Sequence, residues 1–214
     1  MSAIEIPYQF IAIEGNIGAG KTTLASILRN RLNAELILEQ FSDNPFLPAF
    51  YQNPDRHAFS VELFFMAERH KQFQEQFASR SLFTNQIISD YIFDKTLLFA
   101  HNNLEEEEFR LFQRLFNVLK SNFPEPDILI FLYRDVEHLL ANIAKRNRDF
   151  EKKISPEYLL KIQQAYLDYF KTVNTFPIIL IDVEDLDFQN DELFLKKIMQ
   201  RLQRTYAPGL HRLK

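Results

Sequence analysis

Short apolar runs recur along the chain and alternate with longer segments whose apolar residues return every three or four positions. The apolar runs lie at 10–13, 36–38, 87–88, 128–133 and 178–181. Such runs are typical of strands that are buried on both faces of a parallel sheet. The periodic segments between them predict helices at 21–32, 56–79, 93–101, 105–122, 136–145, 156–172 and 191–205. The alternation predicts one α/β domain, residues 1–214, with a five-stranded parallel sheet and helices on both faces.

A glycine-rich segment between the first predicted strand and the first predicted helix matches the pattern G-x-x-x-x-G-K-[ST]. Its residues are Gly15, Asn16, Ile17, Gly18, Ala19, Gly20, Lys21, Thr22 and Thr23. The glycines allow a tight turn whose backbone N–H groups point at phosphate, and the start of the helix adds partial positive charge. Lys21 is expected to reach the β- and γ-phosphates, and Thr22 to bind Mg²⁺. The motif predicts a P-loop fold that binds ATP or another nucleoside triphosphate.

Two acidic residues follow predicted strands, at the edge of the sheet where ligands of parallel sheets bind. Glu39 comes directly after the second strand. It is either a general base, which accepts the proton of an attacking hydroxyl, or an ordinary loop carboxylate. Asp90 comes after the third strand and either binds Mg²⁺, directly or through water, or caps the next helix. Both residues are candidates for chemistry next to the P-loop.

Arg146 and Arg148 lie in the segment RNRDFE, between two predicted helices. Arginines on a loop above a P-loop can stabilise the charge on a transferring phosphoryl group. The end of a helix also favours positive charge without any catalytic role. With the P-loop present, the pattern favours an arginine-bearing lid at about 146–154.

Composition and charge exclude some kinds of site and argue against some kinds of partner. The chain has 214 residues and no cysteine, which excludes disulfides and thiolate metal sites. Its net charge is −4 and it lacks a basic tail, which argues against a nucleic-acid partner. It has no apolar run long enough to span a bilayer and no signal-peptide pattern at the N-terminus, so we expect a cytoplasmic protein without a membrane partner. The tail, 207–214, is expected to be disordered.

The order and spacing of these segments resemble the deoxynucleoside kinase family along nearly the whole chain. The matching segments are GNIGAGKTT at 15–23, NPFL at 44–47, NPDRHAFSVELFFMAER at 53–69 and RNRDFEKKISPEYL at 146–159. The resemblance implies transfer of the ATP γ-phosphate to the 5′-hydroxyl of a deoxynucleoside, with Mg²⁺ as cofactor. It also implies a homodimer.

The resemblance implies roles for individual residues. Glu39 lies where the family's general base usually lies, and Arg146 and Arg148 look like the lid arginines on the donor phosphates. Tyr51 and Glu151 look like the pair that holds the sugar 3′-hydroxyl.

Further residues are implied around the base of the nucleoside. Arg69 looks like the arginine beside the base pocket. Phe41, Phe46, Phe59 and Met66 are candidates for apolar walls around sugar and base, although core packing is the commoner role of such residues.

Glu62 departs from the family pattern, which usually has a glutamine at this place on the long helix. An ionised carboxylate offers only acceptors, whereas glutamine offers a donor and an acceptor. Guanine presents two adjacent donors, so Glu62 predicts a preference for deoxyguanosine and, more broadly, for purines. Two alternatives stay open: burial keeps Glu62 protonated, or Glu62 pairs with Arg69 and does not face the base.

Tyr91 is the second departure, because the family usually has an arginine after the acid at position 90. Tyrosine cannot supply that positive charge, so either another basic residue replaces it or activity is reduced. Lys95 is one helical turn further along and is a candidate. Asn142 similarly stands where an additional lid-helix arginine can occur.

Two other functions are compatible with the sequence. A nucleoside monophosphate kinase, such as a thymidylate kinase, would need extra positive charge for the phosphate of its acceptor, and Glu39 argues against it. A nucleotide-binding regulatory subunit with little catalysis is compatible with the loss of arginine at position 91.

Overall fold

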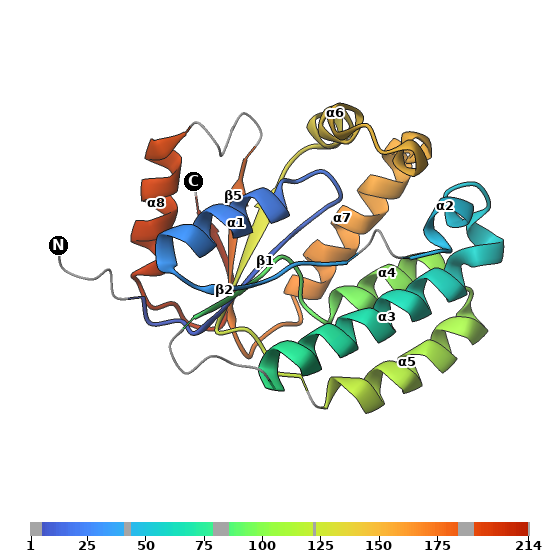
Figure 1. Cartoon of the computed structure of the whole chain (residues 1–214), viewed down its shortest axis with the longest axis horizontal. Helices are drawn as coiled ribbons and strands as arrows, with labels where there is room; N and C mark the ends of the chain where they lie inside the picture. The colour runs from blue at the N-terminus through green and yellow to red at the C-terminus, as the bar shows by residue number, and fades with distance from the viewer. Residues whose placement is uncertain (1–5, 41–43, 79–85, 122, 184–190, 214) are drawn as a thin grey trace.

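A six-stranded parallel sheet forms the centre of the protein in the computed structural model, which describes residues 6–40, 44–78, 86–121, 123–183 and 191–213 (Figure 1). The strand order is β2-β3-β1-β4-β5-β6. The strands are β1 (Phe10–Gly15), β2 (Glu35–Ile37), β3 (Ile87–Ser89), β4 (Ile128–Tyr133), β5 (Pro177–Asp182) and β6 (Gly209–Leu213). The five predicted strands and the α/β class are confirmed.

The sixth strand, β6, was not predicted, and the expectation of five strands was wrong by one. Gly209–Leu213 pairs in parallel with β5, with Leu210 beside Ile178, and the Gly209 N–H donates to the Phe176 carbonyl at 3.0 Å. The disorder expected for 207–214 is therefore not observed over 209–213. The segment GLHRL lacks the continuous apolar run from which the other strands were predicted. An edge strand does not need such a run, because main-chain pairing holds it.

The predicted helices are present, with ends that shift by a few residues. They are α1 (Lys21–Leu32), α3 (Pro54–Ala78), α4 (Lys95–Asn103), α5 (Glu106–Lys120), α6 (Val136–Arg146), α7 (Pro156–Phe170) and α8 (Glu192–Leu202). A one-turn helix, α2 (Leu47–Phe50), and a 3₁₀ helix at Asp149–Lys153 were too short to show a periodic pattern. Within the described ranges, no helix is both long and apolar enough to cross a membrane.

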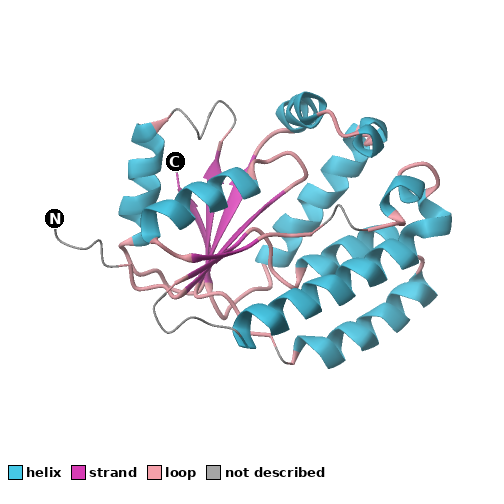
Figure 2. Cartoon of the chain, in the orientation of Figure 1, coloured by secondary structure: helices cyan, strands magenta, loops and turns pink. Residues whose placement is uncertain are grey.

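Helices cover both faces of the sheet, as the alternating strand residues require (Figure 2). On one face Ile11, Ile13 and Ile130 pack against α1, α6 and α8. On the other face Leu129 and Phe131 pack against α7 and α4. Successive residues of a strand point to opposite faces, so a continuous apolar run in β1 or β4 fills two cores at once.

The long helix α3 lies beside α4 and α5 and extends the protein beyond the sheet (Figure 1). Aromatic residues fill this region, with Phe93 stacked on Phe116 at a centroid distance of 5.1 Å. Phe59 and Met66 pack here against Phe112. Both pack in this core and neither lines the cavity described below, so the commoner of the two expected roles, core packing, is the one they have. Phe46, 39% exposed, is not in its wall either.

Candidate active site

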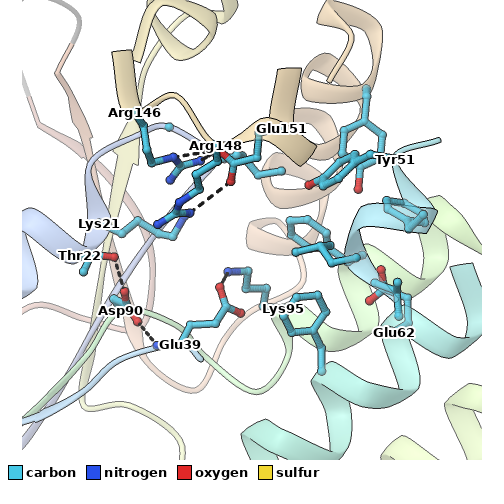
Figure 3. A pocket seen from close by; sticks show the side chains of 18 of the residues that line it. Lys21, Thr22, Glu39, Tyr51, Glu62, Asp90, Lys95, Arg146, Arg148 and Glu151 are labelled. Carbon is cyan, nitrogen blue, oxygen red and sulfur yellow. Dashed lines mark hydrogen bonds and ion pairs between the residues drawn. The ribbon is translucent and has the colours of Figure 1, made fainter. Parts of the chain in front are cut away.

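One cavity opens at the carboxyl ends of the strands, between the P-loop, α3, α4 and the segment after α6 (Figure 3). It encloses about 800 Å³ of space, including the solvent at its mouth. The predicted site residues that line it are Ile17, Gly18, Lys21, Thr22, Glu39, Tyr51, Glu62, Arg69, Asp90, Arg146, Arg148 and Glu151. Phe41 lies outside the described residues. The structure therefore brings the predicted catalytic residues to one place.

The glycines of the P-loop sit where a side chain would collide with backbone. A Cβ on Gly15 would lie 2.8 Å from the Leu132 carbonyl oxygen, and one on Gly18 would lie 2.7 Å from the Leu139 carbonyl oxygen. Gly18 also has φ 85°, in the left-handed region that favours glycine. The loop can pass this closely between β4 and α6 only because these positions lack side chains.

Two asparagine side chains hold the P-loop in place. The Asn16 amide donates to the Leu159 carbonyl of α7 at 2.8 Å, and the Asn142 amide donates to the Gly18 carbonyl at 2.8 Å. At position 142 the family can have an additional arginine. The asparagine of this chain instead holds the P-loop by a hydrogen bond and carries no charge. Neither bond uses a backbone N–H group of the loop, and such N–H groups at the start of a helix are what binds phosphate.

Lys21 reaches back over the P-loop from the first turn of α1. Its ammonium donates to the carbonyls of Gly15 and Asn16 at 2.9 and 3.0 Å. Burial, with a smaller effect of the nearby Lys95 ammonium, lowers the pKa of Lys21 to about 8. A bound triphosphate would favour the charged form, so the site is built for an anion at Lys21.

Asp90 joins the P-loop to the loop that carries Glu39. The Thr22 hydroxyl donates to one carboxylate oxygen at 2.5 Å, and the Glu39 N–H donates to the other at 2.7 Å (Figure 3). These contacts arise because β3 pairs in parallel with both β1 and β2, so the residues after the three strands meet at one edge. A hydroxyl and a carboxylate side by side are the oxygen ligands that Mg²⁺ takes together with phosphates. The residues present fit this ion.

The Glu39 carboxylate is held by two cations. The Arg69 guanidinium donates to Oε1 at 2.5 and 3.0 Å, and the Lys95 ammonium donates to Oε2 at 2.6 Å. Burial alone would raise the pKa of Glu39, but the charges of Lys95 and Arg69 outweigh it and lower the pKa well below the ordinary value. Glu39 is therefore ionised, and its position is fixed.

Lys95 is a candidate for a functional residue that the sequence left undecided. Its side chain is 5% exposed and lies in the cavity wall against Glu39, one turn after Tyr91. The Tyr91 ring is buried in the core, and its hydroxyl donates to Gln72 at 2.9 Å. Lys95 and Arg69 supply the positive charge that Tyr91 does not. Arg69, expected beside the base pocket, also donates to the Thr96 hydroxyl at 2.7 Å.

The expected lid is the end of α6 and the following 3₁₀ helix, where Glu151 gathers both arginines. Arg146 donates to Glu151 Oε2 at 2.5 and 2.9 Å, and Arg148 donates to Oε1 at 3.2 Å (Figure 3). Asn147 between them has φ 53° and ends α6, and both guanidinium groups contact Glu151. The arginines thus lie above the P-loop, across from Lys21.

The far end of the cavity is closed by apolar and aromatic side chains. Tyr51 lies there beside the 3₁₀ helix, with its ring stacked on Phe150 at 6.3 Å. Six further residues line the cavity and were not predicted from the sequence: Leu47, Phe50, Val61, Phe65, Phe99 and Tyr158. Of these, only Phe65 carried a signal, because it lies three residues after Glu62 and four before Arg69 on one helix face.

Glu62 projects from α3 into this apolar end and is 2% exposed. One oxygen, Oε1, accepts a hydrogen bond from the Asn103 amide at 2.7 Å, and Oε2 has no partner. Burial raises the pKa of Glu62 to about 7. The Arg69 guanidinium donates to Glu39 and Thr96, and no hydrogen bond joins it to Glu62 among the described contacts. Burial is therefore the main influence on the protonation of Glu62, and both its forms are populated near pH 7.

Fold and site together define a P-loop phosphotransferase, with the P-loop at one end of the cavity and apolar and aromatic side chains at the other. A sequence profile of the family described as deoxynucleoside kinase matches residues 11–206. The chain belongs to the deoxynucleoside kinase family.

Characterised relatives and solved structures agree with this assignment. The chain is 33% identical over 183 residues to a deoxyguanosine kinase of Bacillus subtilis, covering 84% of this chain and 88% of that one. It is 34% identical over 175 residues to a deoxyadenosine kinase of Dictyostelium discoideum, covering 80% and 71%. The structure of deoxyadenosine kinase from M. mycoides with bound dATP has a TM-score of 0.77 at 25% identity and covers 92% of this chain. That alignment spans all of the M. mycoides chain.

Proposed function

We propose that this protein transfers the γ-phosphate of ATP to the 5′-hydroxyl of a deoxynucleoside, with a preference for purines. Family membership gives the reaction class, and relatives that are named deoxyguanosine and deoxyadenosine kinases support the purine preference. The observation that carries the proposal is the position of Glu39. Its carboxylate lies in the same cavity wall as Lys21, where an acceptor hydroxyl can come between them.

The P-loop and the lid would position the triphosphate. Backbone N–H groups of 15–22 and the Lys21 ammonium would hold the β- and γ-phosphates. Thr22 and Asp90 would hold Mg²⁺, which neutralises charge that develops on the phosphates. Arg146 and Arg148 would add positive charge on the opposite side, with Glu151 setting their direction.

Glu39 would orient the 5′-hydroxyl and accept its proton as the new bond to the γ-phosphorus forms and the bond from that phosphorus to the bridging oxygen breaks, which releases ADP. A carboxylate with a lowered pKa is a weak base, so the proton moves late, when the attacking oxygen has become acidic. Most of the acceleration then comes from position and charge. Tyr51 and Glu151 are proposed to bind the 3′-hydroxyl, and Arg69 would act through Glu39.

An acceptor panel with ATP and Mg²⁺ tests the proposal. It contains the four deoxynucleosides, their ribonucleoside counterparts and the monophosphates. Phosphorylation of purine deoxynucleosides above all others is expected. Faster turnover of monophosphates would instead identify a monophosphate kinase, which the acidic lining from Glu39 and Glu62 disfavours. Tight nucleotide binding without product would identify a regulatory subunit, which the charges of Lys95 and Arg69 disfavour.

Replacing Lys95 with methionine is expected to lower kcat about tenfold to 100-fold, because a charged hydrogen bond to Glu39 is lost. With one cation fewer, the pKa of Glu39 rises, so the acid limb of the pH profile of kcat/KM moves to higher pH. Lys95→Arg should restore part of the rate. The exposed Lys196→Met, on α8, serves as the control. Unchanged kcat together with an unchanged pH profile would show that Lys95 has no role in the reaction.

A homodimer, a cytoplasmic location and the absence of nucleic-acid partners stay predictions. Light scattering of the purified protein tests whether it is a homodimer, and this measurement does not depend on the reaction.

A further inference from the structure

Glu62 places an unpartnered carboxyl oxygen in the wall of the acceptor cavity. The residue is 2% exposed, and its Oε2 makes no hydrogen bond. A buried polar atom without a partner is costly, and in a ligand site it marks a group that the ligand will satisfy. The neighbours of Glu62 in the cavity wall include Phe65 and Tyr158, which suit a flat ring.

Asn103 makes the two oxygens of Glu62 different. Its amide N–H donates to Oε1 at 2.7 Å, while its own carbonyl accepts from the Asn102 amide at 3.0 Å. The contact with Asn102 fixes which end of the Asn103 amide faces Glu62. Because Oε1 already accepts a hydrogen bond, a proton on Glu62 belongs on Oε2, the oxygen without a partner.

We propose that Glu62 selects the base of the nucleoside through its protonation state, the neutral acid taking adenine and the carboxylate taking guanine. This inference rests on the proposed function, in that the cavity holds a deoxynucleoside. Neutral Glu62 offers a donor at Oε2 beside an acceptor at Oε1, which complements adenine N1 and its 6-amino group. Ionised Glu62 offers two acceptors, which complement guanine N1–H and its 2-amino group.

The surroundings keep the two protonation states close in free energy. Burial raises the pKa of Glu62 to about 7, and the Asn103 hydrogen bond and the charge of Arg69, on the same helix, oppose it. From the other elements, Glu39 after β2 raises this pKa and Lys95 of α4 lowers it. The hydroxyls of Tyr51, after α2, and Tyr158, of α7, also face Glu62 and are neutral near pH 7. Below about pH 7 Glu62 is therefore mostly neutral, and above it mostly ionised.

The test is the ratio of kcat/KM for deoxyguanosine to kcat/KM for deoxyadenosine, measured from pH 6 to pH 8. The ratio of ionised to neutral Glu62 changes tenfold per pH unit, so the preference should shift toward deoxyguanosine by up to roughly 100-fold. Titration of ATP and of the other catalytic groups affects both acceptors and cancels in the ratio. A ratio that is constant over this range would overturn the inference.

Three variants sharpen the test. Glu62→Gln carries a fixed donor and acceptor, like the neutral acid, so its ratio should be independent of pH and remain at the deoxyadenosine end. Asn103→Leu removes a hydrogen bond that lowers the pKa, so the midpoint of the shift should move to higher pH. Glu68→Gln, on the same helix but outside the cavity, should behave as wild type. Retention of the pH-dependent ratio in Glu62→Gln would also refute the inference.

Calorimetric binding of the two nucleosides at pH 6 and pH 8 separates this inference from the proposed function. Selective binding that changes with pH, without phosphate transfer, would support the role of Glu62 and contradict the kinase reaction. Phosphate transfer with a ratio of kcat/KM values that does not change with pH would support the kinase reaction and contradict the role of Glu62.

Discussion

Replacement of Glu39 with glutamine is expected to lower kcat about 10²-fold or more, with a smaller change in KM. The glutamine can still accept the hydrogen bonds of Arg69 on its carbonyl oxygen. Its amide nitrogen, however, faces the Lys95 ammonium, 2.6 Å from the present position of Oε2. The variant therefore loses the proton acceptor and also brings two donors together. Steady-state kinetics with deoxyguanosine and deoxyadenosine measure the first effect, and thermal unfolding measures the second.

The double variant Glu39→Gln with Lys95→Met separates these two effects. Methionine removes the second donor, so the midpoint of thermal unfolding should recover toward that of wild type while turnover stays low. Glu107→Gln, at an exposed position at the start of α5, controls for the loss of a surface carboxylate. Normal turnover in Glu39→Gln would reject the role of Glu39 as the general base, whatever the stability of the variant.

Replacement of Lys21 with methionine is expected to lower kcat/KM about 10²- to 10³-fold or more, because a fixed positive charge next to the transferring phosphoryl group is lost. Methionine keeps most of the length of the buried side chain. It removes the hydrogen bonds to the Gly15 and Asn16 carbonyls, which the lysine has to give up in part when phosphate binds. The unfolding temperature should therefore change less than the rate does.

Nucleotide binding distinguishes a damaged P-loop from a missing charge in Lys21→Met. Backbone N–H groups and the glycines remain, so ATP should still bind, with weaker affinity, in a titration calorimeter. Lys196→Met again provides the matched control on an exposed helix face. A variant that turns over normally would remove Lys21 from the mechanism, and a variant that does not fold would be replaced by Lys21→Arg.

Glu39 and Asp90, at the carboxyl ends of β2 and β3, show which parts of the site could be predicted from strand positions. Glu39 and Asp90 are 51 positions apart in the sequence and follow β2 and β3, which pair in parallel. Parallel strands end at the same edge, so the meeting of these residues with Thr22 followed from the strand positions alone. The ion pairs of Glu39 could not be predicted from the sequence. Its partners Arg69 and Lys95 come from helices, and packing sets which face of each helix points toward Glu39.

The sequence by itself determined the α/β class, the P-loop and the acidic residues beside it, because each depends on local pattern and on the common edge of parallel strands. Only the tertiary structure decided which cations pair with Glu39, that Phe59 and Met66 are core, and that β6 completes the sheet. It also decided that Glu62 lines the cavity, with one carboxyl oxygen bonded to Asn103 and the other without a hydrogen-bond partner. These features arise from how α3, α4 and α7 pack against one another, and the free energies that fix such packing are summed over contacts between residues distant in the sequence.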